Sequence, residues 1–478
     1  MKRLHIDKNT LGNIRKQEYE VYKKLHDILD NNRHIFFMTY SSAHIQDLLN
    51  DETDIKLEEA AFIEKFIGNY YLSYNAVDKK LGFFLKSPVE ILKNQKPIDV
   101  SFNNLFEAFD DCDPLLKPLI DILKAQFKAP TLNLEVDPDG LKPYENTLAQ
   151  FLPYNDGPKS IDDFIQHFEA LHQNLSDKNS VLYKETRKTN IDLLKFNLKQ
   201  NLKNADDIDN ILLKSGIGKT LHELIIQMGG SAPSWNEYFL RGFIALNMLA
   251  LDNEKNKKAK FNNLINDADH SYYASHADIL ISEDIGFRFK AGILYQRNNI
   301  KTIIMSPQEF IDYFEKIEIK PMNSVGDFIE LLREQLPSQP YETFKSPNFD
   351  RTTYFYDLNS SLFNYFDHLE FVSDNDTGKF YVLTAKKSYY SIGLFYKEIE
   401  LITNNLSKVI GDDLAKKNLY NEEDDKQLRA NQWEGRMWAF GRIPAALEIN
   451  KGSQKLSLVI GPFNTIENKE ELNEIAEA

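Results

Sequence analysis

Two distant segments of this chain share one pattern, in which a short apolar strand alternates with an amphipathic helix. In the first segment, the pattern predicts a strand at Leu4–Asp7, a helix at Ile14–Leu29 and a buried strand at His34–Thr39. Ser41 or Ser42 then has the residue type that begins a helix, because its hydroxyl can accept a hydrogen bond from an exposed amide. Strands that alternate with helices are typical of a parallel sheet covered by helices.

The second segment repeats this order further along the chain. Strands are predicted at Asp278–Ser282 and Lys301–Met305, with a helix at Gly286–Tyr295 between them and another that begins at Pro307. Both segments therefore have the composition of a parallel α/β unit, and either one alone supplies only two strands.

We expect the two segments to build one sheet. Residues 1–55 and 260–318 would form the two halves of a discontinuous unit, with Leu4–Asp7 beside Asp278–Ser282, because connections in such sheets are short. Residues 56–259 carry apolar side chains at three- and four-residue spacing, which predicts an all-helical insertion. The predicted fold class is therefore α/β, a three-layer α/β/α parallel sheet split by a helical insertion.

The composition changes again after the second segment. Residues 319–478 contain short runs of alternating or apolar character, such as Tyr354–Tyr356, Phe380–Thr384 and Ser391–Tyr396, which predict strands. A helix is predicted at Ile399–Leu414. This part of the chain is expected to be a separate C-terminal α+β domain.

The single cysteine, Cys112, excludes an intramolecular disulfide and a cysteine-based zinc site. No apolar run approaches the roughly 20 residues that a membrane-spanning helix needs. The segment from Met1 to Leu11 is charged and lacks the apolar core of a signal peptide. We therefore expect a cytoplasmic protein without a membrane partner.

The formal net charge of −15 bears on the choice of partner. Proteins that bind nucleic acid gain affinity by neutralising phosphates with Lys and Arg, so an acidic chain argues mildly against tight nonspecific binding. A local basic groove is still compatible with that charge. Candidate groups are Lys255, Lys257, Lys258 and Lys260, and Lys184, Arg187 and Lys188, although solvated helix faces are the simpler interpretation of both.

Four aspartates occupy positions where a parallel sheet places its functional groups. Asp7 and Asp284 each follow a predicted strand, and the carboxyl ends of parallel strands border the crevice in which such sheets bind ligands. Asp47 lies on the helix after the second strand, and Asp267 lies upstream of the later one. Carboxylates in one crevice repel each other unless cations lie between them, and oxygen ligands select Mg²⁺ or Mn²⁺.

Other interpretations of these residues stay open at this point. Aspartates at strand ends are also common as turn formers and helix caps. Three histidines near the acids, His44, His270 and His276, lack the spacing of zinc ligands, which favours supporting or core roles. Near the C-terminus, Trp433 and Arg436 belong to an aromatic and basic cluster that could stack nucleobases, although a packed core edge is the simpler interpretation.

The segments around the acids resemble the PIN and PIN-like domains. The run from Asp267 to Asp284, with Lys290 and Thr302–Phe310 after it, resembles the second half of such a domain. That half has an acid-bearing helix, a buried strand, a Thr/Ser-x-Asp turn and a last strand. Leu4–Asn9 resembles the opening strand with its Asp-x-Asn/Ser motif, and Tyr40–Leu48 resembles the helix that bears the second acid.

The resemblance covers under a quarter of the chain and implies a role for each matching residue. The metal-binding acids would be Asp7, Asp47, Asp267 and Asp284, supported through hydrogen bonds by Asn9 and Ser282. Asp269 and Asp278 are nearby acids, counted here as supporting residues without a defined role. Two features depart from the family: Asp47 stands where Glu is frequent, and the insertion between the halves is far longer than usual.

The function implied by the resemblance is a metal-dependent nuclease that hydrolyses phosphodiesters. RNA is favoured over DNA as its nucleic-acid partner, because the family acts mostly on RNA. Two alternatives remain: a non-catalytic PIN-like interaction scaffold, and a phosphoesterase acting on a small nucleotide, which would suit an acidic chain. The insertion and the C-terminal domain would be the places where a protein partner or a second copy binds.

Overall fold

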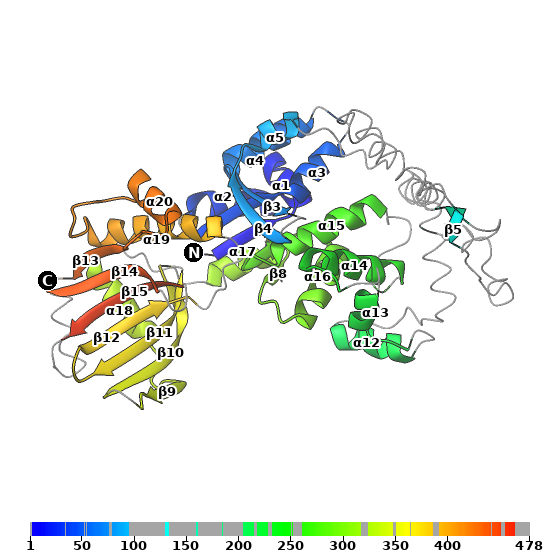
Figure 1. The fold of residues 1–478 in the computed structure, drawn as a ribbon. Helices are drawn as coiled ribbons and strands as arrows, with labels where there is room; N and C mark the ends of the chain where they lie inside the picture. The colour runs from blue at the N-terminus through cyan, green and yellow to red at the C-terminus, as the bar shows by residue number, and fades with distance from the viewer. Residues whose placement is uncertain are drawn as a thin grey trace, which may run out of the picture.

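The protein is a mixed α/β molecule in the computed structural model (Figure 1). The structure describes residues 2–94 apart from 34, 52, 54 and 76–78; residues 204–316 apart from 215–217, 228–231, 250 and 252–260; residues 324–463 apart from 348–349, 364, 386–391, 441 and 451–454; residue 184; and two short strands, β5 (Pro130–Leu132) and β6 (Lys159–Ser160).

A six-stranded sheet forms the centre of the first unit. Its strand order is β4-β3-β2-β1-β7-β8. All neighbouring strands are parallel except β3 and β4, which form an antiparallel hairpin at one edge. The bounds are β1 (Lys2–Ile6), β2 (Phe36–Ser41), β3 (Tyr70–Asn75), β4 (Lys80–Leu85), β7 (Ile279–Ile281) and β8 (Ile303–Met305).

The expected pairing between the two distant segments is confirmed, because β1 pairs in parallel with β7. Leu4 lies opposite Ile279, and Ile6 lies opposite Ile281. Ile279 and Ile281 pack into one hydrophobic core, whereas Leu280 between them packs into another. Because neighbouring side chains of a strand point to opposite faces, the sheet has a separate core on each face.

Helices supply the second half of each core. One core contains residues from α1 (Lys8–Lys16), α2 (Glu20–Asn31), α4 (Ile55–Phe66) and α17 (Pro307–Lys316). The other contains residues from α12 (Ala205–Lys214), α13 (Leu221–Gln227), α14 (Trp235–Met248), α15 (Phe261–Ala274) and α16 (Ile285–Arg297). Two short helices, α3 (Ser42–Leu49) and α5 (Pro88–Asn94), complete this unit.

Two sequence predictions about this unit are wrong. Residues 56–259 are not all helical, because Tyr70–Asn75 and Lys80–Leu85 form the edge hairpin of the sheet. The predicted helix at Ile14–Leu29 is two helices, since Gln17 adopts a left-handed conformation with a φ of 51° and ends α1. The hairpin follows from β-favouring aromatic residues in its strands, such as Tyr71 and Phe83.

The C-terminal unit contains a seven-stranded antiparallel sheet with the order β13-β14-β15-β12-β11-β10-β9. The bounds are β9 (Glu342–Lys345), β10 (Arg351–Leu362), β11 (Phe366–Asp374), β12 (Gly378–Thr384), β13 (Arg436–Phe440), β14 (Ile443–Asn450) and β15 (Lys455–Phe463). Among the described residues of this unit, the helices are α18 (Val325–Gln335), α19 (Ile392–Ile410) and α20 (Glu422–Arg429). The strand predicted at Ser391–Tyr396 is wrong, because α19 begins at Ile392.

The aromatic and basic cluster near the C-terminus belongs to the core of this unit. Trp438 is fully buried, and Arg436 is 3% exposed. The Arg436 guanidinium lies 2.8 Å from an Asp413 carboxylate oxygen and 2.5 Å from one of Asp424. Both ion pairs are buried, so the cluster is not available to stack nucleobases.

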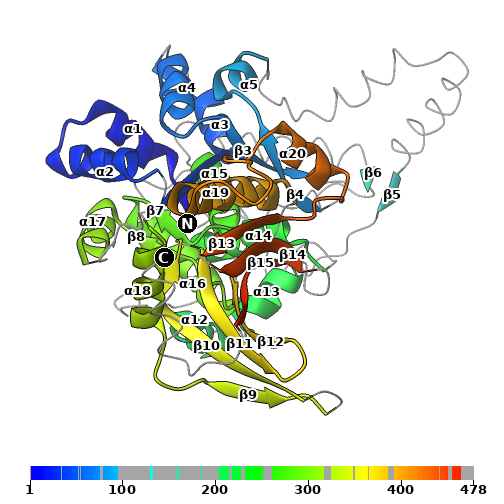
Figure 2. The ribbon, with the colours of Figure 1, turned by 90° about the vertical axis from the view of Figure 1, so that its left-hand side faces the viewer.

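Helix α19 joins the two units and lies between them (Figure 2). Its residues Ile399, Ile402 and Leu406 pack into the core of the C-terminal unit, while Leu394 packs against Phe37 of β2. Glu398 of the same helix forms a buried ion pair with Arg3 of β1, with 2.6 Å between Arg3 Nε and a Glu398 oxygen. Along the described ranges, every helix is too short or too polar to cross a membrane.

Candidate functional site

The carboxyl edge of the parallel sheet holds the residues that the sequence singles out. The chain leaves β1 towards β2 on one side, whereas β7 and β8 extend the sheet on the other side of β1. Such a reversal of strand order opens a crevice at the carboxyl ends of the two central strands, and open α/β sheets bind ligands there. Asp7 directly follows β1, and Asp284 follows β7 after a two-residue turn.

Asp7 and Asp284 each begin a helix. Asp7 is the N-cap of α1, and its carboxylate accepts a hydrogen bond of 2.7 Å from the Thr10 amide. Asp284 is the N-cap of α16 and accepts a 2.8 Å bond from the Phe287 amide. Both residues therefore act as helix caps, which is the structural role that the sequence left open for them.

The buried Ser282 hydroxyl lies beside these two acids. It accepts a hydrogen bond of 3.1 Å from the Asp284 amide. It also acts to lower the pKa of Asp7, against the effect of burial. The Thr10 hydroxyl accepts a further bond of 3.2 Å from the Glu283 amide. The ends of β1 and β7 are thus held together by side chains as well as by the strand pairing.

Asp47 reaches the same edge from α3, where two side chains orient it. The Asn266 amide donates to one carboxylate oxygen at 2.7 Å, and His270 Nε2 donates to the other at 2.9 Å. Burial acts to raise the pKa of Asp47, but the hydrogen bond and charge of His270 lower it on balance. Conversely, burial acts to lower the pKa of His270, and Asp47 raises it on balance. This pair therefore favours the ionised carboxylate.

Asp267 on α15 has the opposite electrostatic environment. Burial raises its pKa to about 7, against the effect of Lys290, and the negative charges of Asp284 and Asp47 add to the rise. The Lys290 ammonium is buried and lies 3.4 Å from an Asp267 oxygen. Burial also raises the pKa of Asp7, although Ser282 and Thr10 oppose that rise. Burial therefore disfavours the ionised form of both Asp267 and Asp7 at this edge.

The structure places the three other expected supporting residues differently. Asn9 is exposed in the first turn of α1. Asp269 accepts a 3.3 Å hydrogen bond from Asn236 of α14 and so is directed to a neighbouring helix. Asp278 precedes β7 at the amino edge of the sheet, where it accepts a 2.7 Å bond from the Arg3 amide. Its place at the far end of the strand corrects the expectation that it supports the acid cluster.

Three buried histidines from different elements lie next to the acids. His5 of β1, His44 of α3 and His270 of α15 each direct one ring nitrogen so that the three nitrogens lie within 4.8 Å of one another. Among the described residues, these three are the only His, Cys, Asp or Glu side chains grouped closely enough to share an ion. The four aspartates do not form such a group. His5 was missed by sequence reasoning, although a histidine between Leu4 and Ile6 is an unusual occupant of a buried strand.

The four acids nevertheless have the donor chemistry that a hard cation requires. They offer carboxylate oxygens, which Mg²⁺ and Mn²⁺ prefer. Burial is the main cause of the raised pKa of Asp267, and the charges of Asp284 and Asp47 add to it; a cation between the carboxylates would offset both effects. Asp7, Asp47, Asp267 and Asp284 thus fit such an ion chemically. In the described structure Lys290 partly fulfils this role for Asp267.

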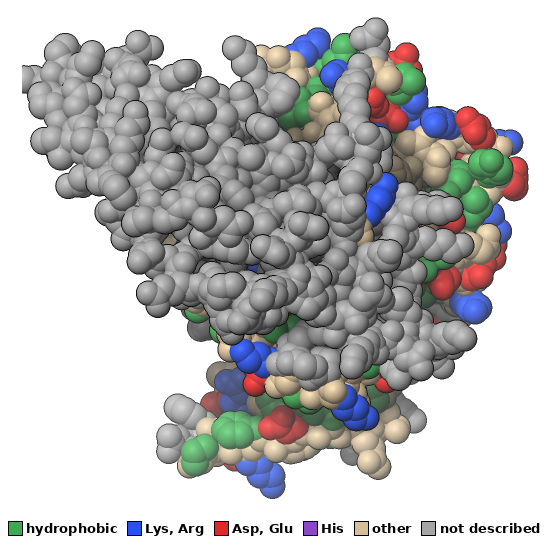
Figure 3. Space-filling view, turned by 90° about the vertical axis from the view of Figure 1, so that its right-hand side faces the viewer, with side chains coloured by type: hydrophobic (Ala, Val, Ile, Leu, Met, Phe, Trp, Pro, Cys, Tyr) green, Lys and Arg blue, Asp and Glu red, His purple; other side chains and the backbone are tan. Residues whose placement is uncertain are grey.

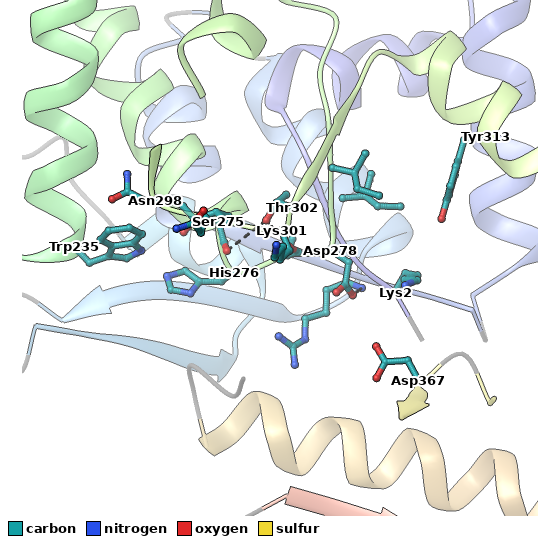
Figure 4. A pocket seen from close by; sticks show the side chains of 16 residues that line it. Lys2, Trp235, Ser275, His276, Asp278, Asn298, Lys301, Thr302, Tyr313 and Asp367 are labelled. Carbon is teal, nitrogen blue, oxygen red and sulfur yellow. Dashed lines mark hydrogen bonds between the residues drawn. The ribbon is translucent and has the colours of Figure 1, made fainter. Parts of the chain in front are cut away.

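A separate cavity of about 650 Å³ lies at the opposite, amino edge of the sheet (Figure 4). Trp235, His276 and Asn298 line one side of it, and Asp367 of the C-terminal unit faces them from across the cavity. Its lining mixes Lys2, Arg3 and Lys301 with Asp278 and Asp367, and Arg3 is already paired with Glu398, so the remaining charges balance. The amino ends of parallel strands are also not where open α/β sheets bind ligands.

The chain was compared with protein-family models, with curated proteins and with solved structures, and none of them matches it. The chemistry of the carboxyl edge therefore has to be interpreted from its own geometry.

Proposed function

We propose that this protein is a metal-dependent nuclease whose active site is the carboxyl edge of the parallel sheet. One observation carries the proposal: Asp7 and Asp284, distant in sequence, follow adjacent parallel strands, and the Thr10 hydroxyl links the two strand ends through the Glu283 amide. Asp47 and Asp267 add their charges to the same edge from two helices. The PIN-like assignment made from the sequence supports this reading and is itself part of the proposal.

The residues of the chain would divide the work between them. Asp7, Asp47, Asp267 and Asp284 would hold Mg²⁺ or Mn²⁺, which when bound would activate water and stabilise the leaving oxygen. Asn266 and His270 keep the Asp47 carboxylate in one orientation. The Thr10 hydroxyl, which accepts from the Glu283 amide, keeps the start of α1 and the turn before α16 in register. A rigid arrangement of this kind reduces the entropy that must be lost to reach the reactive geometry.

A phosphate group also suits the local electrostatics. Helices α1 and α16 both begin at this edge, and a helix N-terminus carries partial positive charge and exposed amides. Lys290 adds a cation beside Asp267. These groups would attract the phosphodiester of a substrate, whereas the mixed lining of the amino-edge cavity offers no such preference.

We favour RNA as the substrate, with the small-nucleotide phosphoesterase and the non-catalytic scaffold as alternatives to be tested. On the face in Figure 3, the described acidic and basic side chains are interspersed. Of the basic groups singled out in the sequence, Lys184 is described, whereas Lys255–Lys260, Arg187 and Lys188 lie outside the described residues. Substrate length is therefore a variable in the experiment.

The decisive experiment replaces Asp284 in two ways. Asn can still cap α16, so Asp284→Asn should keep the stability of the wild-type protein, whereas Asp284→Ala should lose about 1 kcal/mol with the cap. Both variants lose an anionic ligand, so Mn²⁺-dependent cleavage should fall by orders of magnitude in each. Asp278→Asn, at the amino edge, is the matched control and should retain full cleavage.

The assay measures cleavage of RNA, single-stranded DNA and a dinucleotide on the same preparations, with and without Mn²⁺. Cleavage of the dinucleotide alone would select the small-nucleotide alternative. Wild-type protein that binds Mn²⁺ but cleaves nothing would select the scaffold. Retained cleavage in folded Asp284→Asn would show that Asp284 is a helix cap only and would remove the central support of the proposal.

A further inference from the structure

We propose that His5, His44 and His270 form a second metal site, for Zn²⁺ or a similar transition metal, in the core beside the carboxylate edge. The three imidazoles come from β1, α3 and α15 and are 0%, 0% and 4% exposed. One nitrogen from each lies within 4.8 Å of the others. Imidazole nitrogens select zinc, copper, nickel or cobalt over magnesium, so this site differs chemically from the carboxylates.

Two of the histidines already have the surroundings that metal-bound histidines require. A metal-ligating histidine usually donates its second ring N–H to a carboxylate or a backbone carbonyl, which fixes the ring and makes it a better ligand. His270 Nε2 donates to Asp47 at 2.9 Å, which leaves Nδ1 directed at His5 at 3.0 Å. His44 Nε2 lies 2.8 Å from the Ile6 carbonyl oxygen, to which it must donate.

The third histidine meets the cluster through one ring nitrogen. His5 directs Nε2 at His270 Nδ1, and its own Nδ1 is buried without a hydrogen-bond partner among the described residues. A buried ring with an unsatisfied nitrogen is unfavourable in a strand that an apolar residue could occupy, so a histidine here calls for a reason other than packing. An ion between the two rings would replace their contact with two coordinate bonds, and the ring proton of His5 would then lie on Nδ1.

His44 is the ligand that has to give up a contact. Its Nδ1 accepts from the Ser41 amide at 3.1 Å and lies 3.0 Å from the Ser41 hydroxyl. Whichever nitrogen binds the ion, the other keeps a hydrogen-bond partner in Ser41 or Ile6. The ionised Asp47 beyond His270 offsets part of the ion's positive charge, as buried metal sites need.

The test uses the full chain, stripped with a chelator, reloaded with Zn²⁺ alone and desalted. We expect one zinc per chain by elemental analysis, and X-ray absorption of the loaded wild-type protein should show imidazole nitrogen around the metal. His5→Gln and His44→Gln should each weaken zinc binding by about 100-fold or more, beyond what loss of an outer partner causes. His276→Gln, a buried histidine at the other edge, should bind zinc like the wild type.

The outcomes separate this site from the nuclease proposal. Asp284→Asn should keep the zinc while it loses Mn²⁺-dependent cleavage. Absence of bound zinc in the wild-type protein, or an oxygen-only environment in its absorption spectrum, would overturn the histidine site and leave the nuclease untouched. If the glutamine variants fail to fold, as judged by circular dichroism, the wild-type spectrum alone decides.

Discussion

Replacing His276 with glutamine should make the first unit of this protein more resistant to acid. His276 lies between α15 and β7, is 7% exposed and packs edge-on against the Tyr272 ring. Burial, assisted by the charge of Arg3, lowers its pKa from 6.5 to about 3. The folded protein therefore keeps this imidazole neutral over a range of pH in which the unfolded chain protonates it.

The sign and size of the effect follow from that difference in pKa. A group whose folded pKa is depressed favours the unfolded state as pH falls below the unfolded value, here 6.5, until the folded pKa is reached. Each pH unit in that window removes about 1.4 kcal/mol from the free energy of unfolding. Between neutral pH and about pH 5, His276 alone should therefore remove about 2 kcal/mol.

The assay is urea unfolding at several pH values, followed by the fluorescence of Trp235, which lines the same cavity as His276. The difference in stability between His276→Gln and the wild-type protein should shift by about 2 kcal/mol in favour of the variant between neutral pH and about pH 5. Ser275→Ala is the matched control, because it changes the adjacent buried residue without removing a titrating group. A variant whose pH profile runs parallel to that of the wild type would refute the reasoning.

Three further substitutions test contacts elsewhere in the fold. Arg3→Met should destabilise the protein by about 3–5 kcal/mol in urea unfolding, because it leaves the buried carboxylate of Glu398 without its ion-pair partner. Replacing both residues with Met should restore most of that loss. Equal losses in the single and double variants would contradict this. Gly435→Ala should lower the stability of the C-terminal unit by at least about 2 kcal/mol in thermal unfolding, because its φ is 94° and an added Cβ would overlap the Leu447 carbonyl oxygen. Ser234→Ala should cost about 1 kcal/mol through loss of the cap on α14, and an unchanged melting temperature would show that the cap contributes nothing.

The elements that could be predicted from the sequence are those with a strong local signal. The strands β2, β7 and β8 are apolar runs with clear boundaries, β1 is a short alternating stretch, and Ser41 begins α3 as its residue type predicts. The pairing of β1 with β7 followed from chain topology, because parallel sheets leave few places for two such short segments. In these cases the local pattern and the global fold require the same structure.

The failures occur where tertiary context decides. Ser391–Tyr396 looks like a strand, but Leu394 and the following apolar residues face two cores from one helix, a pattern that appears only when both cores are known. Gln17 ends α1 in a left-handed conformation that glycine normally adopts, so composition gave no signal. The cluster of His5, His44 and His270 joins three elements, and no spacing along the chain could reveal it.

The helix caps at Asp7 and Asp284 do not decide between a structural and a metal-binding role, because a carboxylate can have both. A capping carboxylate has two oxygens and about four lone-pair positions, of which an amide hydrogen bond uses one. The Thr10 and Phe287 amides each bond to Oδ1 of their aspartate. Such a cap fixes the side-chain rotamer and holds the second oxygen at the sheet edge, which is the preorganisation that a binding site needs. The distinction therefore lies in the charge, which Asn removes while it keeps the cap, and not in the presence of the cap.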